Sequence, residues 1–489
     1  MKINARAVTY LNGVMLGGMA VALLIPLVYD LAFCSSKNIW LFIPSIVVCL
    51  FIGVSIILSC KVESKLNFSR HDMYLIVVCF WVVFAFLSSF PFYLYSDYKV
   101  DFVSALFEAT SGVTATGATI YSNVESLPKS LILWRFILMF IGGIGIVSIA
   151  IIASPLMKIG GMQLFQTENS DKSNKFLPRS SHLLLFLLVA YVVIISIFVV
   201  LLNLSGMNVF DSICHGISAV ATGGFSTKNE GIAAFNSTQI DLIIGCAMLI
   251  GGLTFLELVG MFKKGLRAFY SNQQTKFYIK FVFGAVLLLV IFSFINNENN
   301  ISVKTAVNIF FGIVSGITTS AFTLTGYTYH SQFFKILFFL LPMIGACSGS
   351  SSGGIKLFRV QIIWEIIKTH MKKIVNPNYI VIPKYYNNAI GQNLMISVVA
   401  FFVLFVFTFI VSIVLICSVG EYDVGTSTIV VGACLFNAGF PLDFLTATTD
   451  TYSSLNTASK IILMIDMLVG RLEVIPIFMV CTPMFWKQK

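Results

Sequence analysis

The sequence predicts an all-α membrane protein: a fourfold repeat of span, pore helix, filter loop and span around a central pore, preceded by two extra N-terminal spans. Three observations lead to this fold class. The chain of 489 residues is 57% hydrophobic and 11% charged, which excludes an ordinary soluble protein. Apolar runs of membrane-spanning length recur along the chain. Shorter amphipathic segments that end in small polar residues lie between later pairs of these runs.

Ten apolar runs are expected to be membrane spans, since a helix needs about 20 residues to cross the hydrocarbon core. They lie near 11–33, 39–60, 73–95, 131–154, 182–204, 239–261, 278–295, 333–346, 393–417 and 459–482. The first run is longer than the apolar part of a signal peptide and lacks an evident cleavage site, so we expect it to be retained. No stretch of mixed composition is long enough to form a soluble domain.

Four segments too short to cross the membrane indicate an internal repeat. They lie at 101–119, 209–227, 304–323 and 424–442, and each is closed by a loop of Thr, Gly, Ser or Asn residues. When Gly117, Gly223, Ala321 and Gly439 are aligned, successive spacings lie between 98 and 118 residues. This recurrence predicts four units around one axis. The chain then divides into two N-terminal spans (1–72) and repeats at 73–181, 182–277, 278–390 and 391–489.

The loops favour a monovalent cation as the permeant species. A short helix that enters the membrane places its carbonyl end, the negative end of its dipole, at the membrane centre. Carbonyls of the turn beyond it can replace a cation's water shell, and Gly permits the φ angles that such a turn needs. The loop tips contain no Arg or Lys for an anion and no Asp or Glu ring for Ca²⁺. The alternative is that these are small-residue packing motifs between helices.

The stretch GACSGSSSGG at 345–354 interrupts an apolar run that would otherwise cross the membrane. Gly and Ser are poor helix formers, and unwound backbone at membrane depth requires protein or a water-filled cavity around its polar groups. Arg471 lies inside the last apolar run, where a charged side chain should face a cavity with a partner. Asp466 and Glu473 are candidate partners, and snorkelling to the membrane surface is the alternative.

The net charge of +10 follows membrane topology rather than a nucleic-acid-binding stripe. Basic residues concentrate in three loops, with Lys158, Lys172, Lys175 and Arg179; Lys263, Lys264 and Arg267; and Lys356, Arg359, Lys368, Lys372, Lys373 and Lys384. Alternate loops are acidic, with Asp97, Asp101, Glu125, Asp211, Glu230, Glu421, Asp423, Asp443 and Asp450. The basic loops and the N-terminus are therefore expected to be cytoplasmic, with no nucleic-acid partner. The ten Cys residues form no CxxC pair, so neither a disulfide framework nor a metal site is expected.

Two ionisable residues in apolar segments allow more than one interpretation. Glu257 is expected near the cytoplasmic edge beside Lys263, with a cavity-facing or protonated carboxyl as the alternative. His215 is expected to be a hydrogen-bonded packing residue rather than a proton relay. No GxxxxGK[ST] motif is present, so the chain is not expected to hydrolyse ATP. A multi-span membrane enzyme, the alternative from another class, would need clustered His, Asp or Glu, and the five His residues are scattered.

Several motifs together resemble the Trk/Ktr/HKT superfamily of potassium transporters and, within it, the TrkH-type subunits. They are LFEATSGVTATGAT, LPKSLILWRFILMFIGGIGI, PLMKIGGMQLFQTE, ISAVATGGFST, GACSGSSSGGIKLFRV and MLVGRLEVIPIFMVCTPMFW. The resemblance covers nearly the whole chain. The two leading spans favour the Trk branch, because Ktr subunits generally lack them.

The resemblance implies which residues form the pore. The four loops would make one selectivity filter for K⁺ ions, with no organic cofactor. The filter residues would be Thr116, Gly117 and Ala118; Thr222, Gly223 and Gly224; Thr319, Ser320 and Ala321; and Asn437, Ala438 and Gly439. Residues 345–354 match the family's gate loop, which here includes Gly345, Cys347, Gly349, Ser350, Gly353 and Gly354. Arg471 would hold the backbone carbonyls of this loop and oppose cation passage.

Ala321 is the main departure from the family pattern, which usually has Gly at this position. Ala at a position that needs a positive φ costs roughly 1 kcal/mol, and its methyl group crowds the carbonyl ring. Selectivity for potassium is therefore expected to be softened.

The resemblance also implies a function: potassium uptake across the inner membrane of a bacterium, by a chain that is not an enzyme. It implies a homodimer and a cytosolic nucleotide-binding regulatory subunit of the TrkA type, docked on the basic loops. A Na⁺-permeable or Na⁺-coupled Ktr-like transporter is the alternative. Channel-like flux and H⁺-coupled symport both stay open from the sequence.

Overall fold

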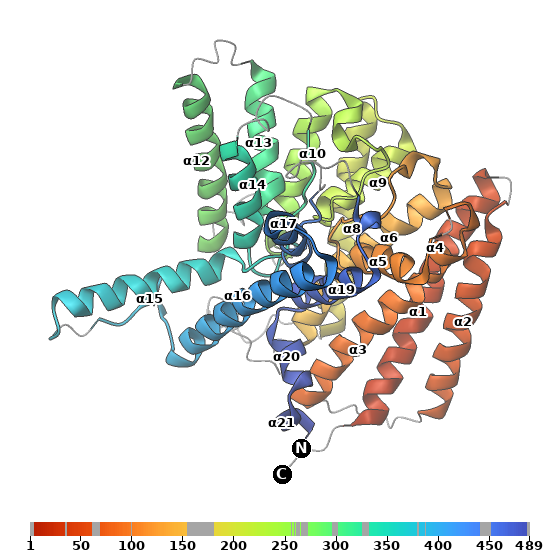
Figure 1. Cartoon of the computed structure of the whole chain (residues 1–489), viewed down its shortest axis with the longest axis horizontal. Helices are drawn as coiled ribbons and strands as arrows, with labels where there is room; N and C mark the ends of the chain where they lie inside the picture. Colours follow the sequence, from red (N-terminus) through yellow and green to blue (C-terminus); the bar gives the residue numbers. More distant parts are fainter. Residues whose placement is uncertain are drawn as a thin grey trace.

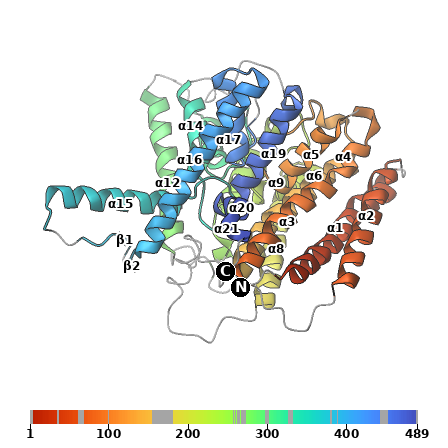
Figure 2. The same cartoon turned by 60° about the horizontal axis from the view of Figure 1, so that its bottom comes forward.

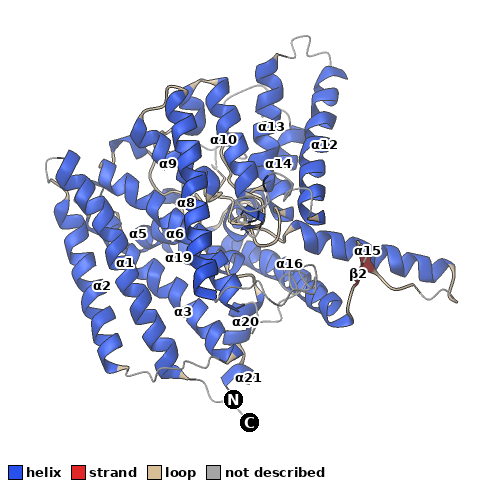
Figure 3. Cartoon of the chain, turned by 180° about the vertical axis from the view of Figure 1, so that it is seen from behind, coloured by secondary structure: helices blue, strands red, loops and turns tan. Residues whose placement is uncertain are grey.

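The computed structural model is almost entirely helical, as Figures 1 and 3 show. It describes residues 4–34, 37–60, 69–98, 100–153, 180–255, 257–258, 260, 265, 272–295, 302–324, 332–378, 381–386, 388–440 and 451–486. Within these residues, the β-structure is one short antiparallel pair, β1 (Lys384–Tyr385) with β2 (Asn388–Ala389). The predicted all-α fold class is confirmed.

The two leading helices, α1 (Ala5–Phe33) and α2 (Ile39–Ser59), pack against each other at one side of the molecule (Figure 1). The buried carboxylate of Asp30 ties this hairpin to the first repeat, because the Ser130 hydroxyl of α6 (Lys129–Ala153) donates to it at 3.1 Å. A buried carboxylate needs such donors to offset the loss of its hydration. The two leading spans therefore form an attached hairpin beside the repeats.

The other helices follow the predicted order of repeated units. In chain order they are α3 (Arg70–Ser88), α4 (Phe90–Leu94), η1 (Ser96–Tyr98), α5 (Phe102–Val113), η2 (Val124–Ser126) and α6; α8 (Ser180–Leu204), α9 (Val209–Val220), η3 (Gly231–Phe235) and α10 (Thr238–Gly251); α12 (Gln273–Ile295), α13 (Val303–Ile317), α14 (Gln332–Ile344) and α15 (Leu357–Val375); and α16 (Gln392–Gly420), α17 (Val424–Leu435), η6 (Tyr452–Ser454), α19 (Thr457–Arg471), α20 (Ile475–Cys481) and α21 (Pro483–Trp486).

The four half-length segments form the helices α5, α9, α13 and α17, which we call the pore helices. Each follows a polar residue whose side chain accepts a hydrogen bond from the N–H three residues later. These capping residues are Asp101, Asn208, Ser302 and Asp423. Three pore helices have 12 residues and α13 has 15, so none is long enough to cross a bilayer. Each therefore ends inside the protein.

The four units close into a ring. The second helix of each unit packs against the pore helix of the next: α6 against α9, α10 against α13, and α14 against α17. The ring closes because α19 of the last unit packs against α5 of the first. The four pore helices therefore surround one axis, as the repeat predicts.

The predicted spans at 239–261 and 459–482 are not continuous helices, which corrects the expectation. The chain leaves helical geometry at 252–254, after α10, and at 472–474, after α19. Gly251 and Gly470 disfavour the helix, and both lie so close to a pore helix that a methyl group would overlap its last carbonyl. Glu473 adopts a left-handed φ of 57°, which ends the second of these helices. Apolar residues continue on both sides, so hydropathy alone does not reveal the breaks.

Six helices of the described residues are long and apolar enough to cross a membrane. They are Ala5–Phe33, Ile39–Ser59, His71–Leu94, Leu185–Leu204, Gln273–Ile295 and Gln392–Gly420. In contrast, α15 packs against α16 and projects sideways from the molecule, on the side opposite to α1 and α2 (Figures 1 and 2). It begins at the centre of the molecule, directly after the stretch at 345–354.

Candidate functional site

Each pore helix ends in the same backbone turn. The first residue after the helix cap is Ala115, Thr222, Thr319 or Asn437, and its φ lies between 51° and 58°. The N–H of the following residue donates to the carbonyl five residues earlier, at 2.9 to 3.0 Å in all four repeats. This is a Schellman turn, which satisfies carbonyls that a helix end leaves free. A left-handed φ is costly for a β-branched residue, so the turns at Thr222 and Thr319 are strained.

Two residues further along, the four turns again have a positive φ: 89° at Gly117, 81° at Gly224, 52° at Ala321 and 46° at Gly439. The structure therefore corrects the alignment of the second repeat, because Gly224, not Gly223, is equivalent to Gly117. For the same reason the first turn begins one residue before the predicted set 116–118. Two adjacent glycines cannot be told apart in the sequence, since only their backbone conformations differ.

Backbone carbonyls of the first three turns lie against a glycine of a neighbouring turn. The residues between the two left-handed positions are Thr116, Gly223, Ser320 and Ala438. A methyl group on Gly117 would overlap the Gly223 oxygen, and one on Gly224 would overlap the Ser320 oxygen. A methyl group on Gly439 would overlap the Thr116 oxygen, which closes the ring from the fourth repeat to the first. Glycine is therefore sterically required at the second left-handed position of the first, second and fourth turns. The third turn has Ala321 at this position.

This arrangement suits a cation without its water shell. Backbone carbonyls gather around one axis at the negative ends of four helix dipoles, where they can take the place of water ligands. A side chain joins the last turn to the first, because the Asn437 amide donates to the Thr116 hydroxyl at 3.0 Å. The same amide donates to the Met467 carbonyl of α19 at 2.9 Å. The predicted loop residues thus come together, with the second-repeat register corrected.

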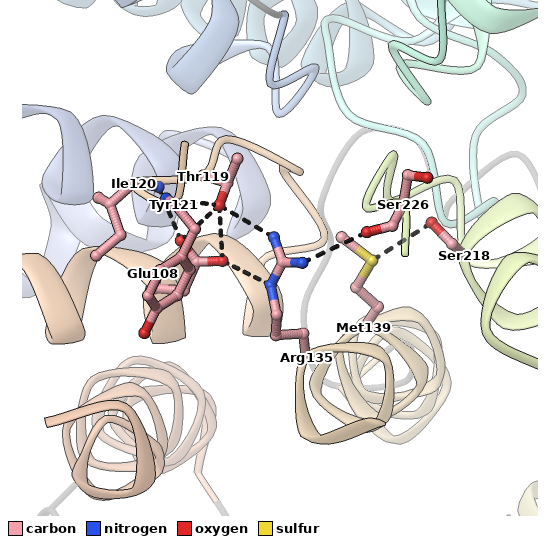
Figure 4. Close-up of polar contacts among 8 residues, drawn as sticks. All are labelled: Glu108, Thr119, Ile120, Tyr121, Arg135, Met139, Ser218 and Ser226. Carbon is pink, nitrogen blue, oxygen red and sulfur yellow. Dashed lines mark hydrogen bonds and ion pairs between the residues drawn. The ribbon is translucent and has the colours of Figure 1, made fainter. Parts of the chain in front are cut away.

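A buried ion pair that the sequence analysis missed supports the first turn (Figure 4). Arg135 of α6 donates to the Glu108 carboxylate of α5 at 2.7 Å, and both side chains are buried. The same carboxylate accepts the backbone N–H of Ile120 at 2.9 Å and the Thr119 hydroxyl at 3.1 Å. These two residues follow the turn directly. The available signal was one acidic and one basic residue, each inside an apolar segment.

Arg135 also reaches the second turn (Figure 4). Its guanidinium lies 3.9 Å from the centre of the Phe225 ring and 3.5 Å from the Ser226 carbonyl oxygen, to which it donates. His215 of α9 holds the Ser226 hydroxyl at 3.0 Å, and its other ring nitrogen contacts the Asp211 carbonyl at 2.9 Å. The expectation that His215 is a hydrogen-bonded packing residue is confirmed. Arg135 therefore links the residues that follow the first turn to those that follow the second.

We expect Arg135→Met to destabilise the protein, because it leaves the Glu108 carboxylate buried without its cation. Removing one partner of a buried ion pair typically costs about 3–5 kcal/mol. The matched control is Lys368→Met, which removes one partner of the exposed Lys368–Glu365 pair and should cost less than about 1 kcal/mol. Thermal inactivation of the detergent-solubilised protein measures both changes. Equal stability of the two variants would contradict the supporting role of Arg135.

The stretch at 345–354 lies directly against the turns, and we call it the plug. It separates α14 from α15, which confirms the predicted break in the helix. The Ser351 hydroxyl is 3.1 Å from the Thr222 hydroxyl, and the N–H of Gly353 donates to the Thr319 hydroxyl at 2.8 Å. A methyl group on Gly353 would overlap the Phe436 carbonyl. The plug therefore touches the second, third and fourth turns.

The plug is also bonded to the break after α10. The N–H of Cys347 donates to the Gly252 carbonyl at 3.2 Å, and the N–H of Phe255 donates to the Gly349 carbonyl at 3.1 Å. Inside the plug, the Ser350 hydroxyl donates to the Cys347 carbonyl at 2.7 Å. Gly345, Gly349 and Gly354 have φ values of 72°, 76° and 73°, which explains the glycine content of this stretch. Two broken helices thus meet beneath the turns.

Arg471 lies against the plug, as the sequence-based hypothesis states. Its side chain is buried, and it donates to the Ser351 carbonyl and, at 2.9 Å, to the Gly142 carbonyl of α6. The two candidate acidic partners bind elsewhere. Asp466 accepts a hydrogen bond from the Ser412 hydroxyl at 2.7 Å, and Glu473 pairs with Arg359. Backbone carbonyls therefore hold this guanidinium, which rules out the snorkelling alternative.

Lys356 and Arg359 are buried beside the plug, whereas the sequence analysis placed them with the basic residues of a cytoplasmic loop. This corrects the expectation. Only 7% of Lys356 and 2% of Arg359 is exposed. The Lys356 ammonium donates to the Ser350 carbonyl at 3.4 Å, to the Ser352 hydroxyl at 3.0 Å and to the Ser352 carbonyl. Sequence position placed both residues beside exposed lysines, and the signal missed was the short distance from the plug. The basic residues at 158–179, Lys263, Lys264 and Arg267, and the acidic residues Asp443 and Asp450 lie outside the described residues.

Glu257, directly after the break that follows α10, is buried and accepts a hydrogen bond from the Thr275 hydroxyl of α12. Glu257 is therefore a buried, hydrogen-bonded residue beside the first turn of α12. Lys263, the neighbour expected at the cytoplasmic edge, lies outside the described residues.

Comparison with known proteins agrees with this architecture. The family model TrkH, described as a cation transport protein, matches residues 40–488. The Trk system potassium uptake protein TrkG of Escherichia coli K12 is 30% identical over 488 residues, which is 99% of each chain. TrkH of the same strain is 31% identical over 429 residues, covering 87% of this chain and 88% of the relative.

A solved structure has the same fold. The crystal structure of the potassium transporter TrkH from Vibrio parahaemolyticus superposes with a TM-score of 0.90 at 27% identity, covering 99% of this chain and all of that one. The match extends over the leading hairpin and the four repeated units. The fold and the relatives are therefore those of transport proteins, not of enzymes. The chain belongs to the TrkH family of cation transport proteins.

Proposed function

We propose that this chain takes up potassium across the inner membrane of a bacterium, through a filter formed by its four turns. The observation that carries the proposal is the ring of contacts in which each of three glycines leaves room only for a carbonyl of the next repeat. Such a ring of backbone oxygens binds K⁺ in place of water. The names of the relatives, which are potassium uptake proteins, support the choice of ion.

The backbone of four short segments binds K⁺ ions in the filter: Thr116 and Gly117, Thr222 to Gly224, Thr319 to Ala321, and Asn437 to Gly439. The plug acts as the gate, and Arg471 holds it closed. The contacts of Ser351 and Gly353 with the turns support this assignment, because a segment in that position blocks the axis beneath the filter.

The assembly we propose is a homodimer with a cytosolic nucleotide-binding subunit of the TrkA type. The N-terminus and the basic loops lie on the cytoplasmic side, where this subunit docks. The exposed lysines of α15, which projects sideways from the molecule, support an interaction on that side (Figure 2). The positive-inside distribution of the loop charges supports the orientation.

Growth of a potassium-uptake-deficient bacterium on low-potassium medium tests the proposed function. The intact chain should restore growth, whereas a variant with Ser at Gly117, Gly224 and Gly439 should not, although it reaches the membrane. Rescue that depends on added Na⁺ would favour a Na⁺-coupled transporter instead. Absence of rescue by the intact, membrane-inserted protein, when its regulatory partner is also supplied, would contradict potassium uptake.

We expect Ala321→Gly to sharpen discrimination against Na⁺. Ala321 has a φ of 52°, which costs roughly 1 kcal/mol relative to Gly. The other three turns have glycine, without a methyl group, at the equivalent position. Since 1.4 kcal/mol corresponds to a tenfold change, relief of this strain should raise the K⁺/Na⁺ permeability ratio several-fold. Ala438→Gly is the control: it lies in the fourth turn at a residue without a left-handed φ, so the change should have a smaller effect on the ratio. An unchanged ratio in Ala321→Gly would mean that the ring accommodates the methyl group without strain.

A further inference from the structure

Two buried cations hold three consecutive carbonyls of the plug. Arg471 donates to the carbonyl of Ser351, the middle residue. Lys356 donates to the carbonyls on either side of it, those of Ser350 and Ser352. The ammonium also takes the Ser352 hydroxyl at 3.0 Å, so its three donors all meet oxygens of the plug. The plug is therefore held by two buried positive charges, one from the third repeat and one from the fourth.

The lysine belongs to the segment that leads into α15. Lys356 is the residue before the first turn of α15 and has a φ of 75°, a strained value for a residue with a side chain. One turn later, Arg359 pairs with Glu473 at the break after α19, two residues beyond Arg471. Its guanidinium also lies 3.9 Å from the centre of the Phe401 ring of α16. The start of α15 is thus bonded both to the plug and to the segment that carries the other cation.

The geometry points to Lys356 as a second latch of the gate, which holds the plug closed together with Arg471 and releases it when the start of α15 moves. The inference rests on the proposed function of the plug as a gate. A Lys ammonium bound by carbonyls in the permeation path occupies oxygens that a permeant cation could otherwise use, and it repels that cation. Because the latch residue directly precedes α15, a displacement of this helix withdraws the ammonium from the plug.

Removal of the ammonium is the direct test. K⁺ flux and the K⁺/Na⁺ permeability ratio are measured in liposomes for wild type, Lys356→Met, Lys356→Gln, Lys356→Arg and Arg471→Met. A hydrogen bond to a charged group is strong enough that its loss should raise the flux of Lys356→Met about tenfold. The permeability ratio of Lys356→Met should stay at the wild-type value, because the filter is unchanged. Lys356→Arg keeps a positive charge and donors, so its K⁺ flux should be close to that of wild type. Lys280→Met, the same change at an exposed position of α12, is the control and should leave flux unchanged.

The outcomes separate the latch from the gate itself. If Arg471→Met raised the flux and Lys356→Met did not, Lys356 would be a packing residue and the latch would be wrong, whereas the gate would stand. If neither variant raised the flux, the gate assignment would fail and the latch with it. If Lys356→Met and Lys356→Gln both failed to fold while Arg471→Met folded, the ammonium would serve folding, which would also overturn the latch. The latch is supported if Lys356→Met raises the K⁺ flux at an unchanged permeability ratio and Lys356→Arg does not.

Discussion

Gly224→Ala is expected to lower the K⁺/Na⁺ permeability ratio at least about tenfold, whereas Gly223→Ala should have a much smaller effect. Gly224 has a φ of 81°, and a methyl group there would overlap the Ser320 carbonyl oxygen, which is part of the backbone ring. A backbone oxygen cannot move without disturbing the neighbouring turn. A methyl group on Gly223 would instead meet the end of the Met139 side chain, which is flexible and can rotate away.

The size of the effect follows from two terms. The φ angle alone costs roughly 1 kcal/mol for Ala, and displacing the Ser320 carbonyl adds to this. Because 1.4 kcal/mol corresponds to tenfold in binding, a loss of at least about tenfold in the K⁺/Na⁺ permeability ratio is expected for Gly224→Ala. Single-variant measurements on the reconstituted protein compare the two neighbours. A larger effect at Gly223 than at Gly224 would show that the second-repeat register derived from the backbone is wrong.

Arg471→Met is expected to raise potassium flux by about tenfold or more, with no loss of selectivity. The guanidinium is buried, and its hydrogen bonds go to the Ser351 carbonyl of the plug and the Gly142 carbonyl of α6. Met keeps much of the side-chain volume but supplies no donor and no charge. The plug then loses a charged hydrogen bond, worth about 1.5–3 kcal/mol, and the passing cation no longer meets a fixed positive charge.

Shortening the plug gives an independent measure of the same barrier. Deletion of several residues within 347–352 should also raise the flux, because it removes the segment beneath the turns rather than the residue that holds it. Initial K⁺ uptake rates into liposomes, normalised to folded protein, measure both changes. A flux at or below the wild-type rate in both well-folded variants would count against the plug as a barrier.

The architecture was accessible from the sequence because its signals are repeated. The four half-length segments, the small polar loops that close them and the interrupted helix at 345–354 all recur or stand out against apolar surroundings. The fold class and the half-length helices were therefore predicted correctly. The breaks after Gly251 and Arg471 were missed because hydropathy continues across them, and only the close approach to a pore helix explains them.

The site was predicted in outline and not in its supporting contacts. The choice between Gly223 and Gly224 depends on φ, which adjacent identical residues do not reveal. Lys356 stands close to exposed lysines in sequence, yet its ammonium folds back onto the plug. The Glu108–Arg135 pair joins residues 27 positions apart on two helices, so its partners are defined only by the packing of α5 against α6. Tertiary contacts of this kind carry no local pattern.

The reversal potential of the reconstituted protein under opposing K⁺ and Na⁺ gradients tests the central claim most directly. A filter made of the four turns predicts a reversal potential close to the K⁺ equilibrium potential, and Gly224→Ala should shift it towards that of Na⁺. A wild-type reversal potential close to the Na⁺ equilibrium potential, or one that none of Gly117→Ser, Gly224→Ala and Gly439→Ser changes, would contradict the claim that these four turns select potassium.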